Sequence, residues 1–140
     1  MMLARIDQYT AEIDQLTARI GELCQPYERQ VAQLSTIPGV SERAAQDLIA
    51  EIGVDMSRFP TPAHLASWAR QAPGISESAG RRKSKSAGRG NPYFGGTLGE
   101  AAISASRTQT FLGTRYRRLV RQMPKAKAQR AIMRAILVIT

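Results

Sequence analysis

The sequence has few residues from which a disulfide or a metal centre could be built. It contains one cysteine, Cys24, and one histidine, His64. A single cysteine cannot form an internal disulfide, and a zinc site needs several Cys, His or carboxylate ligands close together. We therefore expect no cofactor to be bound by this chain, and no catalytic or ligating role for His64.

Long hydrophobic runs are also missing. Charged residues are spread through the first two dozen positions, so the sequence shows neither the apolar centre of a signal peptide nor a membrane span. We expect no membrane partner. With one cysteine in the chain, the reducing cytoplasm is the expected location.

Acidic residues are nearly absent from the C-terminal part of the chain. Residues 81–140 contain 14 Lys and Arg against one acid, Glu100, whereas residues 1–80 contain 6 basic and 10 acidic residues. A segment this basic attracts polyanions, and phosphate contacts gain affinity by releasing counterions. DNA is therefore the leading partner. A membrane surface is the weaker alternative, since bulky aromatic residues are not interleaved with the cations.

The N-terminal residues carry a heptad pattern. Apolar residues recur with alternating spacings of three and four, at Ile6, Tyr9, Ile13, Leu16, Ile20, Leu23, Tyr27, Val31 and Leu34. One amphipathic helix should therefore run from about Leu3 toward Leu34, with Pro26 as the place where it can kink. We predict that residues 1–33 are a coiled-coil helix that pairs with another copy of the chain. The alternative is a helix that packs on its own domain.

A short turn separates this helix from the next one. Ser41 can cap the second helix, Gly53 can end it, and its apolar face would be Ala44, Leu48, Ile49 and Ile52. Apolar residues on each side of a glycine between two helices form the helix-hairpin-helix pattern, in which the backbone approaches a phosphate near a helix N-terminus. We predict DNA contacts without base specificity at Pro38, Gly39 and Val40. The alternative is an ordinary helical turn.

Further short helices are expected around a basic loop. Thr61 and Pro62 can begin one helix, for which Pro73 would lie past the end, and Phe59, Leu65, Trp68 and Ala69 should be core residues. Residues 74–92 have no hydrophobic period, which predicts a flexible cationic loop that becomes ordered on a phosphate backbone. Helices should follow from Asn91, after Gly113, and from about Lys125. The predicted DNA-binding residues here are Arg81, Arg82, Lys83, Lys85, Arg89, Asn91, Arg115, Arg117 and Arg118.

These patterns together predict an all-α fold. A long, coiled-coil-like N-terminal helix, residues 1–33, would precede a compact bundle of short helices, residues 34–140, that contains the helix-hairpin-helix and the basic loop 74–92. The chain ends at Thr140 within an apolar run that has no capping signal, so we expect the last helix to be cut short.

Short motifs follow one another in order over residues 30–140. They include Leu34-Ser-Thr-Ile-Pro-Gly-Val, Ala50-Glu-Ile-Gly, Ala66-Ser-Trp-Ala, Ala72-Pro-Gly, Glu77-Ser-Ala-Gly-Arg-Arg-Lys-Ser, Gly90-Asn-Pro-Tyr, Glu100-Ala-Ala, Tyr116-Arg-Arg-Leu and Ile136-Leu-Val-Ile. In this order they resemble the C-terminal domain of the IS-one-ten family of insertion-sequence transposases, also called bridge-RNA recombinases.

The resemblance implies a function in DNA transposition and recombination. In that family, a resolvase-like domain with acidic metal ligands precedes a coiled coil and this helical domain, which supplies a serine nucleophile. By position in Glu-Ser-Ala-Gly, the serine is Ser78. The resemblance also implies Mg²⁺ in the acidic domain and a guide RNA as a further partner. That domain is not in this sequence, so we expect the chain alone to be inactive.

Two positions depart from the family pattern. Gly95 stands where an arginine is usual, and Arg134 lies near the place of a usual histidine. Two other functions are consistent with the residues. One is a non-enzymatic helix-hairpin-helix DNA-binding or architectural protein, in which Ser78 has no role. The other is a helical oligomerisation module whose basic face is only solvated.

Overall fold

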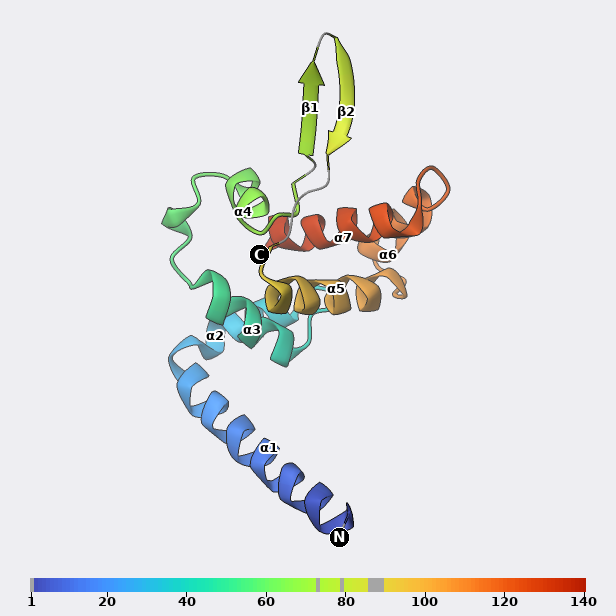
Figure 1. Cartoon of the computed structure of the whole chain (residues 1–140). Coiled ribbons are helices and arrows are strands. Elements are labelled where there is room, and N and C mark those ends of the chain that lie inside the picture. Colours follow the sequence, from blue (N-terminus) through green and yellow to red (C-terminus); the bar gives the residue numbers. More distant parts are fainter. Residues whose placement is uncertain (1, 73, 79, 86–89) are drawn as a thin grey trace.

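Short helices make up most of the structure, a computed structural model that describes residues 2–72, 74–78, 80–85 and 90–140 (Figure 1). The N-terminal elements are α1 (Met2–Cys24), the 3-10 turn η1 (Gln25–Tyr27), α2 (Glu28–Ser35), α3 (Glu42–Ile52), the 3-10 turn η2 (Met56–Arg58) and α4 (Pro62–Trp68). The strands β1 (Gly74–Ser78) and β2 (Arg81–Lys85) precede α5 (Pro92–Ser106), α6 (Phe111–Leu119) and α7 (Lys125–Ile139). The predicted all-α class is confirmed, with one small hairpin added to it.

Helices α5 and α7 form the centre of the body. They pack against each other through small and branched side chains, and Leu98, Ala102, Ala105, Ile132 and Ile136 have no exposed surface. Alanines at the contact allow the two helix axes to come close. Helix α3 packs on α5, α4 packs on α7, and α6 contacts both central helices. The apolar face predicted for α3 lies in or against this core.

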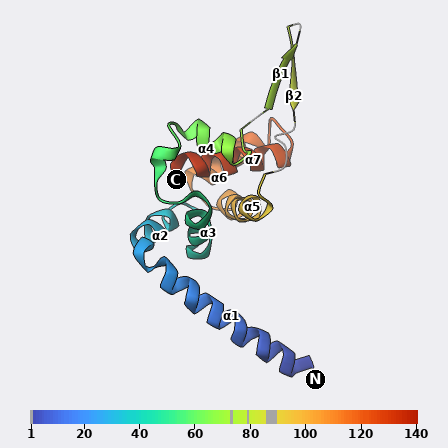
Figure 2. The ribbon, with the colours of Figure 1, turned by 60° about the vertical axis from the view of Figure 1, so that its left-hand side comes forward.

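Helix α1 extends away from the body, at the end opposite to the hairpin (Figures 1 and 2). None of its described residues is buried. The apolar heptad residues, which we call the seam, are open to solvent, with Ile6, Ile13 and Leu16 about 60% exposed. The continuous helix predicted from Leu3 to Leu34 is interrupted at η1. Pro26 causes the break because a proline nitrogen has no hydrogen to donate within the helix.

The turn between α2 and α3 is held tightly against α5. Gly39 has a φ of +89°, and a Cβ atom added there would lie 2.5 Å from the backbone nitrogen of Ala105. Ser41 caps α3 as predicted, since its hydroxyl oxygen accepts a hydrogen bond from the backbone N–H of Ala44. Gly53, with a φ of +79°, ends the helix. The pair of helices and the short turn predicted from the sequence are therefore present.

The prediction that residues 74–92 form a flexible loop is wrong, because this segment contains an antiparallel hairpin. Strands β1 and β2 pair from Gly74 opposite Lys85 to Ser78 opposite Arg81, and Gly80 in the turn has a φ of +73°. The sequence shows no alternation of apolar and polar residues here, and the strands are specified by their pairing with each other. Pro73 and the predicted DNA-binding residue Arg89 lie outside the described residues.

Two helix ends also differ from the prediction. Helix α4 ends at Trp68, several residues before Pro73. Trp68 packs edge-on against Phe94, with ring centroids 5.5 Å apart, but it stays 45% exposed and is not the core residue that was predicted. Helix α6 begins at Phe111, so Gly113 lies inside its first turn, close to the carbonyl of Thr108 where a side chain would collide.

Candidate nucleic-acid interface

The hairpin brings the candidate nucleophile into register with the cations. Ser78 pairs with Arg81, Ser76 with Lys83 and Gly74 with Lys85. Because successive residues of a strand alternate between faces, position 78 shares one face of the hairpin with positions 81, 83 and 85. Four of the predicted site residues therefore fall on one face of the hairpin.

The other face has a different composition. It holds position 77 opposite position 82 and position 75 opposite position 84, which pairs Glu77 with Arg82 and Ile75 with Ser84. Arg82 therefore lies on the face opposite to that of Ser78.

The hairpin joins the body between α4 and α5, where Asn91 fixes the start of α5 (Figure 1). The Asn91 Oδ1 atom accepts hydrogen bonds from the backbone N–H groups of Tyr93 and Phe94, at 2.9 and 3.3 Å. The Nδ2 atom donates to the Glu51 carboxylate at 2.9 Å. Both ends of the Asn91 side chain are thus bonded within the protein, and its contribution is to position the chain that leaves the hairpin.

The predicted arginines of α6 have different surroundings. The Arg117 guanidinium donates to the carbonyl of Thr108 at 3.1 Å, to the Oε1 atom of Gln109 at 3.3 Å and to the hydroxyl of Thr114 at 3.1 Å. It holds the α5–α6 connection together. Arg115 and Arg118 are exposed, and neither side chain has a hydrogen bond or ion pair within the described part of the chain.

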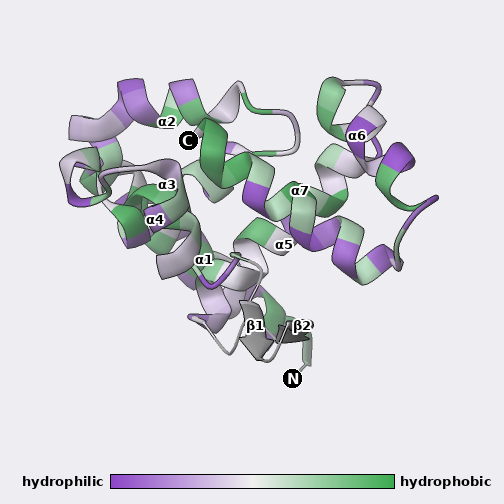
Figure 3. Cartoon of the chain, turned by 90° about the horizontal axis from the view of Figure 1, so that it is seen from above, coloured by the Kyte–Doolittle hydropathy of each residue, from purple (hydrophilic) through white to green (hydrophobic). Residues whose placement is uncertain are grey.

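Four more cations continue this basic surface around the corner from α6 to α7. Arg121, Lys125, Lys127 and Arg130 are exposed, and purple, hydrophilic segments alternate with green ones along α6 and α7 (Figure 3). We call Arg115, Arg118, Arg121, Lys125, Lys127 and Arg130 the corner cations. The last four were not among the predicted site residues, although the sequence offers a signal, since no acid occurs after Glu100.

The acidic side chains that could neutralise these cations lie elsewhere. Within the described residues, the ion pairs are Arg19 with Glu22 at 2.7 Å and Arg43 with Asp47 at 3.6 Å, both in the N-terminal half. Since unpaired surface cations attract a polyanion, the corner cations keep a positive field available for a phosphate backbone.

The turn at Pro38, Gly39 and Val40 offers less to a phosphate than the pattern predicts. Val40 is 6% exposed and Pro38 is half-buried. Helix α5 occupies the space where a side chain at position 39 would be. Close packing thus accounts for the glycine. The N–H groups at the start of α3 lie beside Glu42, an exposed acid in the first turn. DNA contact at this turn stays a prediction.

Other titratable groups do not form a centre of chemistry in the described residues. His64 lies in the first turn of α4, where its Nδ1 atom is 2.8 Å from the hydroxyl of Thr61. Hydrogen bonds from Ser57 hold the pKa of Asp55 below its usual value, which stabilises the start of η2. No three His, Cys, Asp or Glu side chains in the described ranges come together to hold a metal ion.

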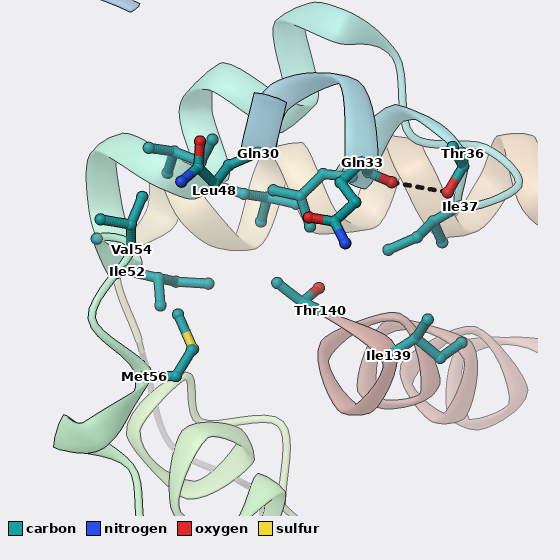
Figure 4. A pocket seen from close by; sticks show the side chains of 13 residues that line it. Gln30, Gln33, Thr36, Ile37, Leu48, Ile52, Val54, Met56, Ile139 and Thr140 are labelled. Carbon is teal, nitrogen blue, oxygen red and sulfur yellow. Dashed lines mark hydrogen bonds between the residues drawn. The ribbon is translucent and has the colours of Figure 1, made fainter. Parts of the chain in front are cut away.

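An open pocket of about 370 Å³ lies between α2, α3, η2 and the end of α7 (Figure 4). Leu48, Ile52 and Ile139 are among its lining residues, with Gln30 and Gln33 contributed by α2. No charged side chain lines it, so it does not resemble a phosphate site.

Comparison with known proteins identifies the class of protein to which this arrangement belongs, a transposase-type domain. The family model described as "Transposase IS116/IS110/IS902 family" matches residues 31–117, which run from α2 to α6 and include the hairpin. The chain belongs to this transposase family. Comparison with curated proteins finds no match. None of the helices in the described ranges combines the length and apolarity needed to cross a membrane.

Proposed function

We propose that this chain is the DNA-binding C-terminal part of an insertion-sequence transposase. It binds the sugar-phosphate backbone with the hairpin and the corner cations, and in the complete enzyme Ser78 is the nucleophile that cleaves and exchanges DNA strands. The observation that carries the proposal is the hairpin register, which sets Ser78 on the face of Arg81, Lys83 and Lys85, in a chain of a transposase family.

This register suits attack on a phosphodiester. In the proposed step, the Ser78 Oγ atom forms a bond to phosphorus, and the bond from phosphorus to one deoxyribose oxygen of the DNA breaks. The proton of the serine hydroxyl goes to a base in another part of the complete transposase, and the departing sugar oxygen takes up a proton and becomes a hydroxyl. Negative charge grows on the phosphate oxygens as this happens. Cations beside the reacting phosphate offset that charge, which is the usual role of arginine and lysine in phosphoryl transfer.

The family resemblance assigns Mg²⁺ to an acidic domain. The side chains in the described ranges do not fit such an ion, since they contain no cluster of three or more possible ligands. Removal of the hydroxyl proton and help for the leaving oxygen are therefore expected from other parts of the complete transposase. We propose a guide RNA as a further partner from the family resemblance alone, and a cytoplasmic location from the single cysteine of the chain.

The test uses the complete recombinase, reconstituted with its acidic domain. Ser78→Ala should abolish strand exchange while leaving DNA affinity within about twofold, because the methyl side chain cannot attack phosphorus and no charge is lost. Ser84→Ala is the matched control, since position 84 lies on the opposite face of the same hairpin. Unchanged strand exchange in Ser78→Ala would refute the nucleophile and favour an architectural DNA-binding protein.

We also propose that α1 pairs with α1 of a second copy of the chain. The supporting observations are the regular heptad seam and its exposure, since no residue of α1 is buried by the rest of the described chain. A helix with an apolar stripe is stable in water when that stripe is covered, and an identical helix with the same spacing provides a matching surface.

A further inference from the structure

Helix α4 ends in an unusual way. The backbone N–H of Gln71 donates to the carbonyl of Ala66 at 2.8 Å, and the N–H of Arg70 donates to the carbonyl of Ser67 at 3.1 Å. This turn requires a left-handed residue, and Arg70 fills the position with a φ of +55°. Among the described residues, Arg70 is the single non-glycine residue with a positive φ.

An arginine is a poor choice for this position as far as the fold is concerned. Left-handed helix caps favour glycine, because a Cβ atom crowds the following carbonyl oxygen. Within the described part of the chain, no hydrogen bond or ion pair of the Arg70 side chain compensates for the strain, and the residue is exposed. Strained backbone at an exposed charged residue is typical of a functional position.

The location of Arg70 indicates what the function is. A Cβ atom placed on Gly90 would lie 3.3 Å from both the Cβ and the Cγ atoms of Arg70, so the arginine stem packs where the chain returns from the hairpin to α5. We call this place the foot of the hairpin. The stem is held against the backbone at Gly90, and Arg70 as a whole residue is exposed.

We propose that Arg70 forms a phosphate-binding subsite at the foot of the hairpin. This inference rests on the proposed DNA binding and adds to it a contact that lies in the helical body. A guanidinium presents two parallel N–H groups to phosphate oxygens, which suits a strand that runs along the hairpin toward α4 and α5. The strained backbone is kept because it aims the arginine at that strand.

The experiment measures DNA affinity and thermal stability together, with the full chain and a labelled duplex of mixed sequence. Arg70→Gly should raise Tm by about 2–4 °C because the left-handed position is relieved. The same change should weaken binding about five- to tenfold near 0.1 M salt. It should also reduce the magnitude of the negative slope of log K against log salt by about 0.9, the value for one lost phosphate contact.

Two more variants test whether the change in slope comes from the charge at position 70 or from the loss of any one positive charge. Arg70→Lys keeps the charge, so it should keep the wild-type slope. Arg5→Ala removes the same charge from α1, at the far end of the molecule, and should leave the slope unchanged (Figure 1).

Each result decides between the two proposals. A salt-dependent wild type whose slope is unaffected by Arg70→Gly would overturn the subsite and leave the proposed DNA binding standing. An equal fall in slope for Arg5→Ala, or a lower Tm for Arg70→Gly, would also overturn the subsite. A wild-type chain whose affinity does not fall with salt would overturn both proposals.

Discussion

The fold requires a glycine at position 39 but not at position 96. Gly39 has a backbone conformation that other residues avoid, and α5 occupies the space beside its Cα atom. Gly96 lies in the interior of α5, is exposed, and has open space where a side chain would be. The first glycine is required by the fold, whereas the packing of the described chain gives no reason for the second.

Alanine at these two positions should therefore change stability in opposite directions. Gly39→Ala should lower the free energy of unfolding by about 2–4 kcal/mol, because the methyl group strains the turn and displaces α5. Gly96→Ala should raise it by about 1 kcal/mol, the difference in helix propensity between the two residues. Urea denaturation of both variants measures the effects. Equal stability of Gly39→Ala and the wild type would contradict the contact with α5.

Two arginines one position apart on α6 should separate stability from binding. Arg117→Ala removes three hydrogen bonds that hold the α5–α6 connection, so the free energy of unfolding should fall by about 1–2 kcal/mol. Arg118→Ala breaks no such bond within the described residues and should leave stability nearly unchanged. Because Arg118 is a predicted phosphate contact, the magnitude of the negative slope of log K against log salt should fall by about 0.9.

Denaturation curves and DNA titrations of the same two preparations provide the measurements. Loss of stability in Arg118→Ala, or an unchanged slope, would remove Arg118 from the predicted DNA-binding residues. The comparison is direct because both variants lose one arginine from the same helix.

At the scale of elements, the helices could be predicted and the hairpin could not. Helix α3 has a serine cap, a periodic apolar face and a glycine at its end, so the residues at which it begins and ends can be predicted from the sequence. The hairpin carries Ser, Glu, Arg and Lys on its strands, which indicate a loop by composition. Its strands are specified by the turn at Gly80 and by cross-strand pairing, and those depend on register.

The candidate site was predictable to the same extent. The cations of residues 81–140 were evident from charge alone, but their surroundings depend on tertiary contacts. Asn91 and Arg117 make hydrogen bonds with other residues of the chain, and Gly39 packs on α5. The sequence contains no signal for Arg70, because its significance lies in a backbone angle that composition and periodicity do not reveal.

At the scale of the whole molecule, the seam of α1 is the feature to test. Leu16→Glu places a charge on the seam, whereas Gln15→Glu adds the same charge beside it, and both positions are exposed. Leu16→Glu should reduce the mass of the particle to that of one chain, and Gln15→Glu should leave paired chains intact, because a buried charge opposes pairing. Light scattering over a range of concentrations measures the mass. A single-chain mass for the wild type would contradict the proposed pairing.

The attachment of the hairpin has a consequence for how this protein can vary. Its two strands pair with each other, and the core of the described residues consists of the helices and the turns that join them. Substitutions in the strands can therefore alter charge, length or chemical reactivity without loosening the body that carries them. A domain built in this way can acquire or lose its reactive element while its scaffold still folds.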